Sequence, residues 1–569
     1  MKDIIFANLP DLCDKEVSAI ASRSAWQKVR FTAGDISGEM LYAGELCTPE
    51  DLRFKLGLRG WHKIYVATIN MKSVNYFNLR LSSDEGFSGM RDPSSGKKFM
   101  WTPLEYAEEF FWKCADLTDE ELILSKPDSH FKNGCTLVWV RCVPMTSDEV
   151  LEYNKKSGSD SVMIHFDEDT NAEDSLNSDE GLLTRFVSLS GTDVKECSVE
   201  ISFDYDNLPE EGEINLLAND EGWTVGDREF MEVREHAYKL RCDYLHKKGM
   251  RVYATNRMSV ASFTSPYSNH YWTRKGFVSE HPEFYCKMRD GSTVNVCSYA
   301  YPEVMEYVIN NLLSFMKYGF DGLTLIFNRG LHIGFEEPVL NLFASRYPRV
   351  DPRTLPVTDK RLNSVWSDFM VVFLTELRER LTAEWGLDKK INVIVDYSPE
   401  TSAHFGIDTE RFIKLGLVDG VCQGIMEMYE DLEGCVDRSG SINIEKYKEK
   451  MKHEPVLRRY HDTDVQKLTE GAREHLEICD RYGADFYASL PWPHKMAPED
   501  YPKYKSDMKD IGVTKFLSWN TNHLIYDLPE YMAAVMGDKL TEEMYMPKRY
   551  RVTSLSGSNI AVFNPNWRG

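Results

Sequence analysis

The chain has 569 residues, which is too long for one ordinary domain. A hydrophobic content of 42% and a charged content of 28% are typical of globular proteins, and no apolar stretch is long enough to span a bilayer. The net charge of −23 argues against nucleic acid and anionic membranes as partners, because their phosphates would be repelled.

The first thirty residues lack a basic segment followed by an uninterrupted apolar segment. We therefore expect no secretory signal and a cytoplasmic protein, although a trimmed secreted chain would look the same. The twelve cysteines are scattered, and none belongs to a C-x-x-C or Cys/His cluster with zinc spacing. Buried free thiols in a reducing compartment are the expected state.

Residues 1–150 contain short β-type runs separated by Asn, Asp, Ser and Gly. This pattern predicts an antiparallel β-sandwich of the jelly-roll kind. Its aromatic residues could bind a sugar, but alternating aromatic residues in strands usually pack inward, so we favour a structural role. The predicted strands are Glu39–Ala43, His62–Ile69, Tyr76–Leu81, Glu109–Ala115 and Thr136–Val143.

Residues 151–540 repeat one pattern six times: a helix-like run ends in glycine, and an apolar β-type run follows within a few residues. Glycine commonly ends helices because it adopts the left-handed conformation without strain. The glycines are Gly249, Gly319, Gly386, Gly416, Gly483 and Gly512. The strands that follow them are Met250–Ala254, Gly322–Phe327, Ile391–Val395, Gly420–Ile425, Ala484–Leu490 and Lys515–Trp519.

Two earlier apolar runs, Ser161–Phe166 and Cys197–Phe203, complete a set of eight strands that alternate with helical patterns. This alternation predicts a (β/α)8 TIM barrel. The segments that leave the strands are long and those that enter are short, so the excess length lies on the face where such barrels build their sites. A doubly wound open sheet is the alternative, but the first strand lacks its glycine-rich phosphate fingerprint. The tail, residues 541–569, carries a β run at Asn559–Phe563 that would join the sandwich or close over the barrel.

Polar residues at the predicted strand ends are the candidates for chemistry, because the carboxyl ends of barrel strands meet at one mouth. Two carboxyl groups there can divide acid and base duties, while amides, arginine and tryptophan can hold a sugar. The substrate-binding candidates are His165, Asp167, Asn256, Asn328, Arg329, Trp492, His494, Trp519 and Asn520.

Glu427 is the first catalytic candidate, because a carboxylate within an apolar strand is costly unless it is used or paired. A salt bridge to a barrel residue such as Arg329 is the structural alternative. Asp396 follows the same logic, although the Ser-Pro-Glu sequence after it could equally cap the next loop. Glu336 and Glu337 stand just before a helical pattern, where a carboxylate could instead stabilise the helix N-terminus.

The stretch Tyr301–Gly330 resembles a segment of glycosyl-hydrolase-like (β/α)8 proteins of the family-10-type group, in which a helix leads into the fourth strand. The matching residues are Pro302, Glu303, Val304, Tyr307, Asp321, Gly322 and Arg329. The resemblance covers roughly the barrel and implies a glycosidase-type fold. One departure is Ile326, which stands where many relatives carry Asp. An acid would therefore have to come from elsewhere, such as Glu336 or Glu337, or hydrolysis has been lost.

These observations predict a β-sandwich followed by a TIM barrel that hydrolyses glycosidic bonds of an oligosaccharide or glycoside. Glu427 would act as nucleophile or base and Glu337 as acid, with Asp396 a second candidate for either role. The alternatives are a sugar or sugar-acid lyase or isomerase, and a degenerate barrel that binds glycans through its sandwich. We expect a carbohydrate substrate and no cofactor, and the chain could be a homo-oligomer. A metal site lacks supporting spacing; its ligands would be His165, Asp167, Asp206 and Glu427.

Overall fold

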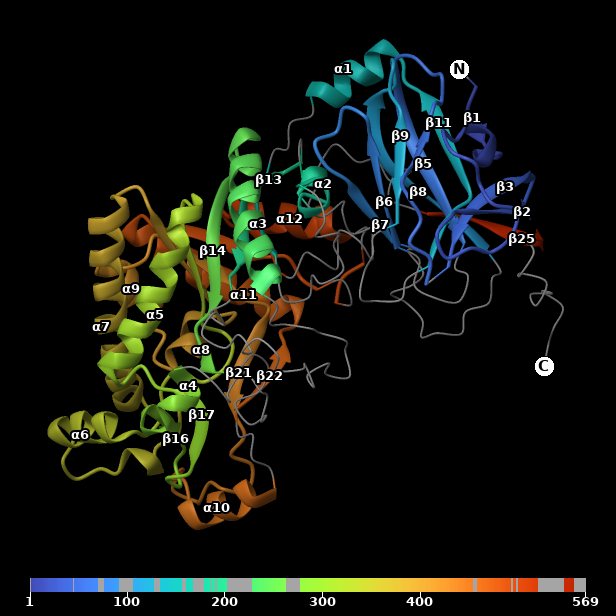
Figure 1. Cartoon of the computed structure of the whole chain (residues 1–569). Helices are drawn as coiled ribbons and strands as arrows, with labels where there is room; N and C mark the ends of the chain where they lie inside the picture. The colour runs from blue at the N-terminus through green and yellow to red at the C-terminus, as the bar shows by residue number, and fades with distance from the viewer. Residues whose placement is uncertain are drawn as a thin grey trace.

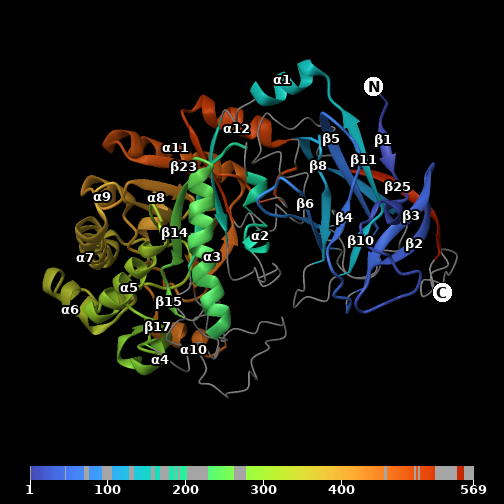
Figure 2. The same ribbon diagram turned by 45° about the horizontal axis from the view of Figure 1, so that its top comes forward.

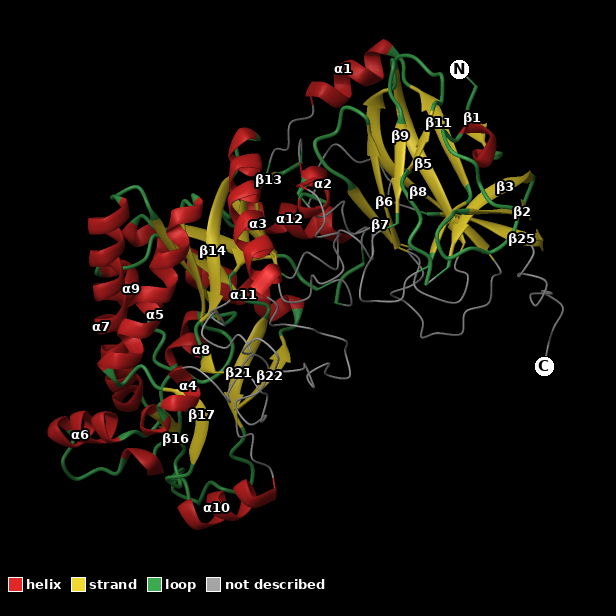
Figure 3. Cartoon of the chain, viewed as in Figure 1, coloured by secondary structure: helices red, strands yellow, loops and turns green. Residues whose placement is uncertain are grey.

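Figure 1 shows the computed structural model of the chain, in which a barrel of parallel strands and a group of antiparallel sheets lie side by side. The rotated view in Figure 2 shows the same arrangement. Helices gather around the barrel, whereas the antiparallel part is mostly strand (Figure 3). The structure describes residues 2–44, 46–69, 76–91, 106–126, 134–155, 160–166, 179–184, 186–189, 192–201, 228–261, 277–453, 458–492, 495–497, 500–519 and 547–556.

The antiparallel part contains two sheets that share one apolar core. The larger sheet contains β1 (Ile4–Phe6), β2 (Gln27–Ala33), β3 (Ile36–Ala43), β5 (Trp61–Ile69), β8 (Tyr106–Asp116), β10 (Cys135–Leu137), β11 (Trp139–Pro144) and β25 (Lys548–Ser556). The smaller sheet contains β4 (Leu52–Phe54), β6 (Tyr76–Leu81), β7 (Ser88–Arg91) and β9 (Leu122–Ser125). Their strand orders are β1-β11-β5-β8-β25-β2-β3-β10 and β4-β9-β6-β7. Val66 and Phe110 of the larger sheet share the core with Leu79 and Leu124 of the smaller one, as in a β-sandwich.

Strand β25 returns the end of the chain to the sandwich, where it pairs with β8 and β2. The strand precedes the predicted run Asn559–Phe563, which lies outside the described residues. A short helix, α1 (Ser147–Lys155), follows the last sandwich strand before the barrel begins.

The barrel strands are β12 (Ser161–Phe166), β13 (Val194–Glu200), β14 (Arg251–Arg257), β18 (Gly322–Ile326), β19 (Lys390–Val395), β20 (Gly420–Gln423), β23 (Asp485–Ser489) and β24 (Lys515–Ser518). They are parallel and lie in chain order, and pairing of β24 with β12 closes the barrel. The predicted TIM barrel is confirmed. The six glycines predicted to end helices all have positive φ, between 69° and 105°.

Helices cover the outside of the barrel. The principal ones are α3 (Arg228–Lys247), α5 (Pro302–Ser314), α7 (Lys360–Trp385), α9 (Thr409–Lys414), α11 (Val465–Tyr482) and α12 (Tyr501–Asp510), with short α2 (Asp179–Leu182) and α8 (Pro399–Ala403). Trp366, Met370 and Phe373 of α7 are fully buried, as their helical spacing predicts. None of the helices in the described part of the chain combines the length and hydropathy needed to cross a bilayer.

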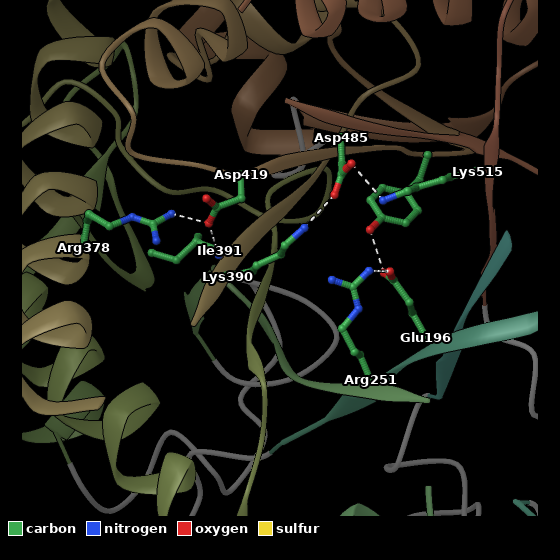
Figure 4. Close-up of polar contacts among 9 residues, drawn as sticks. Glu196, Arg251, Arg378, Lys390, Ile391, Asp419, Asp485 and Lys515 are labelled. Atoms are coloured by element: carbon green, nitrogen blue, oxygen red, sulfur yellow. Dashed lines mark hydrogen bonds and ion pairs between the residues drawn. The ribbon is translucent and has the colours of Figure 1, made fainter. Parts of the chain in front are cut away.

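Charged residues at the amino ends of the barrel strands pair with one another (Figure 4). Asp485, the first residue of β23, lies 2.8 Å from the Nζ atoms of both Lys390 and Lys515. Arg251, the first residue of β14, pairs with Glu196 of β13. These ion pairs lie at the amino end of the barrel, opposite the end at which TIM barrels carry their chemistry.

The long segments that leave the barrel strands form further elements at the carboxyl end (Figures 1 and 2). They are the sheet of β15 (Val260–Ala261), β16 (Tyr285–Lys287) and β17 (Thr293–Cys297), the hairpin of β21 (Met426–Glu430) and β22 (Arg458–Asp462), and helices α4 (Phe277–Glu280), α6 (Glu337–Arg346) and α10 (Ile444–His453). We call the carboxyl ends of the barrel strands, with the residues that directly follow them, the mouth.

The sandwich contacts the barrel near its amino end. Glu85, in the turn between β6 and β7, pairs with Lys247 and lies 2.9 Å from Nζ of Lys248, at the end of α3 that leads into β14. The N–H group of Phe87 donates to the carbonyl oxygen of Glu180 in α2, at 3.4 Å. The contacts of Glu85 lie away from the mouth, because the end of α3 leads into a barrel strand.

Candidate active site

Asp396 directly follows β19 and is buried, with 3% of its surface exposed. The backbone N–H group of Met428 partly offsets the raised pKa of the Asp396 carboxyl group, while Oδ1 has no hydrogen-bond partner in the described part of the chain. Burial, followed by the negative charge of Glu427, raises the pKa of Asp396 well above its ordinary value. Asp396 therefore keeps its proton to a higher pH than an exposed aspartate, as a general acid must.

Glu427 lies on the β21–β22 hairpin, so the prediction that it ends a barrel strand is wrong. Strand β20 ends at Gln423, and the chain turns at Gly424 into the separate strand β21. Glu427 is 7% exposed, and its Oε1 lies 3.2 Å from Nζ of Lys467 on α11. Glu427 thus forms a salt bridge with a lysine of a covering helix, whereas the predicted alternative named a barrel arginine.

Lys467 is a half-exposed lysine that sequence reasoning missed. Its Nζ lies 5.6 Å from the centre of the Tyr397 ring, next to Asp396 in the chain. The hydrogen bond to Glu427 and its negative charge raise the pKa of Lys467. Lys467 is a cationic neighbour of Glu427, whereas the charged neighbour of Asp396 is a carboxylate, so the two carboxyl groups lie in different electrostatic surroundings.

Asn328 follows the last residues of β18 at the mouth and is 1% exposed. Neither its amide oxygen nor its amide nitrogen has a hydrogen-bond partner among the described residues. A Cβ atom at Gly424 would lie 2.3 Å from the Asn328 amide nitrogen and 2.3 Å from the carbonyl oxygen of Val395. The missing side chain at Gly424 therefore lets the buried amide lie beside the strand end that carries Asp396, where it could bind a hydroxyl group.

Aromatic residues form the floor of the mouth. The ring of Trp519, after β24, stacks on that of His165 in β12 with a centroid distance of 4.6 Å. The guanidinium carbon of Arg329 lies 5.8 Å from the Trp519 ring. His165 and Trp519 are buried, whereas Trp492, after β23, is partly exposed against the same apolar cluster. Trp492 is therefore the better surface for a sugar ring.

A third acidic residue, Glu200, ends β13 at the mouth and is buried. Its Oε1 lies 2.9 Å from Nε of Arg257, and its Oε2 lies 3.7 Å from Nε2 of His165. The Asn256 amide nitrogen donates to the Arg257 carbonyl oxygen at 2.7 Å, so one of its hydrogen-bond donors is already used within the protein. Sequence reasoning missed Glu200, although a glutamate within an apolar strand is the same signal that identified Glu427.

Glu336 and Glu337 lie at the start of α6. Glu336 is fully buried, where its carboxylate accepts from the N–H groups of Lys287 at 2.8 Å and Gly334 at 3.0 Å. Burial raises the pKa of Glu336. Glu337 is exposed in the first turn of α6. This position matches the alternative prediction, in which the carboxylate stabilises the N-terminus of the helix. After burial, the negative charge of Glu427 is the main cause that raises the pKa of Asp396, so the electrostatics favour this pair over Glu427 with Glu337.

Asp167, Asp206, His494 and Asn520 lie outside the described residues. Within the described ranges, no group of three or more His, Cys, Asp or Glu side chains is arranged to hold a metal ion.

No family model and no curated protein sequence matches the chain, so the family-10-type resemblance stays a prediction. The solved structures similar to it include glycoside hydrolases. The PgaB (BpsB) glycoside hydrolase domain from Bordetella bronchiseptica is 12% identical, with 67% of this chain and 100% of that chain covered and a TM-score of 0.37. The glycoside hydrolase domain of PelA from Pseudomonas aeruginosa is 11% identical, with 63% and 94% covered and a TM-score of 0.31.

A GH26-CBM35 β-(1,4)-mannanase from Podospora anserina is aligned over 95% of this chain and 97% of its own, with 10% identity and a TM-score of 0.28. At such scores neither the fold nor the activity of this chain is inferred from these proteins. The barrel is established by its own strand pairing, and the activity is inferred from the residues at its mouth.

Proposed function

We propose that the barrel is a glycoside hydrolase in which Asp396 is the general acid and Glu427 is the nucleophile or base. The observation that supports this most directly is the pair of carboxyl groups at the mouth, one buried and the other held by Lys467. Glycosidases use such a pair in opposite protonation states on either side of the scissile bond.

In the proposed reaction, the carboxyl group of Asp396 protonates the glycosidic oxygen as its bond to the anomeric carbon breaks. The Glu427 carboxylate either attacks the anomeric carbon, for later release by water, or takes a proton from the attacking water. Asn328 would bind a hydroxyl group of the sugar, since its amide is buried without a partner among the described residues. Trp492 would pack against the C–H face of the ring.

The test is hydrolysis of a panel of α- and β-linked glycosides by the parent chain and by the Asp396→Asn and Glu427→Gln variants. Each variant should lose at least about 100-fold in kcat, the usual contribution of a positioned acid or base. Glu337→Gln is the matched control and should keep the parent rate. Full activity of both site variants, or a parent chain that hydrolyses no member of the panel, would contradict the proposal.

A further inference from the structure

We infer that Arg289 is the positioning residue that holds the β21–β22 hairpin, and with it Glu427, over Asp396. The inference rests on the proposed function of the Asp396–Glu427 pair. Glu427 belongs to a two-stranded sheet outside the barrel, and an isolated hairpin is at best marginally stable in water. Its position therefore depends on contacts beyond its own ladder.

The hairpin is fastened at both ends of β21. At the barrel end, the N–H group of Gly424 donates to the carbonyl oxygen of Val395 at 2.8 Å. At the far end, Glu430 accepts from Arg289 through both carboxylate oxygens, with 2.6 Å to Nε and 2.8 Å to Nη2. Glu427 lies between these two anchors.

Arg289 joins three of the long segments at the mouth. It lies just after β16, is 1% exposed, and donates from Nη1 to the carbonyl oxygen of Arg353 at 2.8 Å. Its guanidinium carbon lies 4.8 Å from the centre of the Phe335 ring. Phe335 and Arg353 both belong to the segment after β18. A planar guanidinium group that donates two hydrogen bonds to one carboxylate fixes the orientation of the carboxylate as well as its distance. A lysine ammonium group would fix only the distance.

The alternation of side chains along β21 connects this contact to the candidate site. Successive residues of a strand point to opposite faces, so Met428 and Glu430 share one face and Glu427 lies on the other. Met428 is buried with Phe335, and its backbone N–H group acts on the carboxyl group of Asp396. The strand thus lies against Asp396 while Arg289 and the apolar contact hold the Met428–Glu430 face, and movement of Glu430 would displace Glu427.

A purely structural role is the competing explanation, since losing one partner of a buried ion pair destabilises any fold. The sandwich contains a matched pair, in which Arg141 donates to Glu109 at 2.7 Å from Nη2 and 3.0 Å from Nε. Both side chains are buried. Arg141→Lys therefore controls for the general effect of losing a buried arginine fork.

The experiment compares Arg289→Lys with Arg141→Lys. It measures glycoside hydrolysis, thermal unfolding and the titration of Asp396 from the infrared C=O band of a protonated carboxyl group that Asp396→Asn lacks. Arg289→Lys should lower kcat by about 10- to 100-fold, because small misplacements of a reacting group are costly. The titration midpoint of Asp396 should fall by about one pH unit or more, because the hairpin no longer covers it. Arg141→Lys should lower the melting temperature without changing either readout.

An unchanged kcat and an unchanged Asp396 midpoint in Arg289→Lys would overturn the inference, even if Asp396 and Glu427 prove essential. A shifted midpoint in a chain that hydrolyses no glycoside would support the role of Arg289 and reject the proposed function. If Arg289→Lys does not fold, Glu430→Gln provides the same test from the other partner, because the amide keeps one acceptor and the shape of the side chain.

Discussion

Asp396 and Glu427 are chemically similar side chains that the fold places in different surroundings. Asp396 is enclosed at the end of a barrel strand, and the charged group that raises its pKa is another carboxylate. Glu427 is held by Lys467, which is open to water on one side. Burial disfavours the charged form of Asp396, and a neighbouring negative charge disfavours it further. The assignment of Asp396 as the acid follows from its enclosure and from the carboxylate beside it.

Replacing Asp396 by asparagine should change how stability depends on pH. Below the ordinary pKa of aspartate, Asp396 is protonated in both the folded and unfolded chain, and ionisation contributes nothing. As the pH rises toward the raised pKa of the folded chain, the unfolded chain loses the proton first, so the parent loses stability. The amide of the Asp396→Asn variant cannot ionise. The free energy of unfolding of this variant should therefore exceed that of the parent by an amount that grows with pH. The excess should reach about 1.4 kcal/mol for each unit by which the pKa of Asp396 is raised.

Denaturant unfolding at several pH values checks this prediction, with Asp359→Asn as the control of opposite sign. The hydrogen bonds from Arg361 lower the pKa of Asp359, so this carboxylate stabilises the fold above its ordinary pKa and the benefit is lost as pH falls. Relative to the parent, Asp359→Asn should therefore become less stable as pH rises from acid to neutral. Parallel pH curves for Asp396→Asn and the parent would show that Asp396 titrates as an ordinary aspartate.

The β21–β22 hairpin is the element that determines whether the two carboxyl groups meet. In the sequence, GVCQGIMEM is one apolar run in which only Gly424 interrupts the pattern, and this run predicts that Glu427 continues the barrel strand. The break depends on Gly424 lying close to Val395, at the end of β19, and to Asn328, just after β18, and both are distant from it in the sequence. Lys467 could not be predicted either, since it lies forty positions along the chain on a helix and meets Glu427 only through the hairpin.

Gly424→Ala should disrupt the turn from β20 into β21. An added Cβ atom would lie 2.3 Å from both the Val395 carbonyl oxygen and the Asn328 amide, and the backbone atom cannot move aside as a flexible side chain could. We expect a loss of about 1–3 kcal/mol in the free energy of unfolding, as for other overpacked sites. We also expect a drop of about 100-fold in kcat, because Asn328 and Glu427 are displaced together.

Gly416→Ala separates strain from steric overlap. Gly416 has a φ of 69° but nothing within 4 Å of an added Cβ atom, so alanine there should cost about 1–2 kcal/mol of stability and leave kcat unchanged. Equal kcat values for the two alanine variants would mean that the close contacts at Gly424 do not position the site.

The order of elements along the chain was predictable for the barrel and less so for the sandwich. Most barrel strands follow a helix within a few residues, so a glycine and an apolar run predict them locally. Strand β2 was missed because QKVRFTA carries charged residues between its buried ones, as its alternating burial requires. Strand β25 pairs with β8 across more than four hundred positions, as in the ion pair of Arg549 with Glu108, and such pairing leaves no local pattern.

The contact between sandwich and barrel should couple the unfolding of the two parts. A Cβ atom at Gly86 would lie 2.8 Å from Val187 and 3.0 Å from Leu183, so the turn between β6 and β7 packs directly on the barrel's helical layer. Gly86→Val should force these surfaces apart, and calorimetry should show a single unfolding transition resolve into two. Hydrolysis should stay within about twofold of the parent, because the turn lies near the amino end of the barrel and the candidate site at the mouth. Glu85→Gln is the control, because it weakens only exposed ion pairs, which contribute little to stability.

A single unfolding transition of Gly86→Val at the parent temperature would show that this turn does not couple the two parts. A large loss of hydrolysis would show that docking of the sandwich affects the mouth.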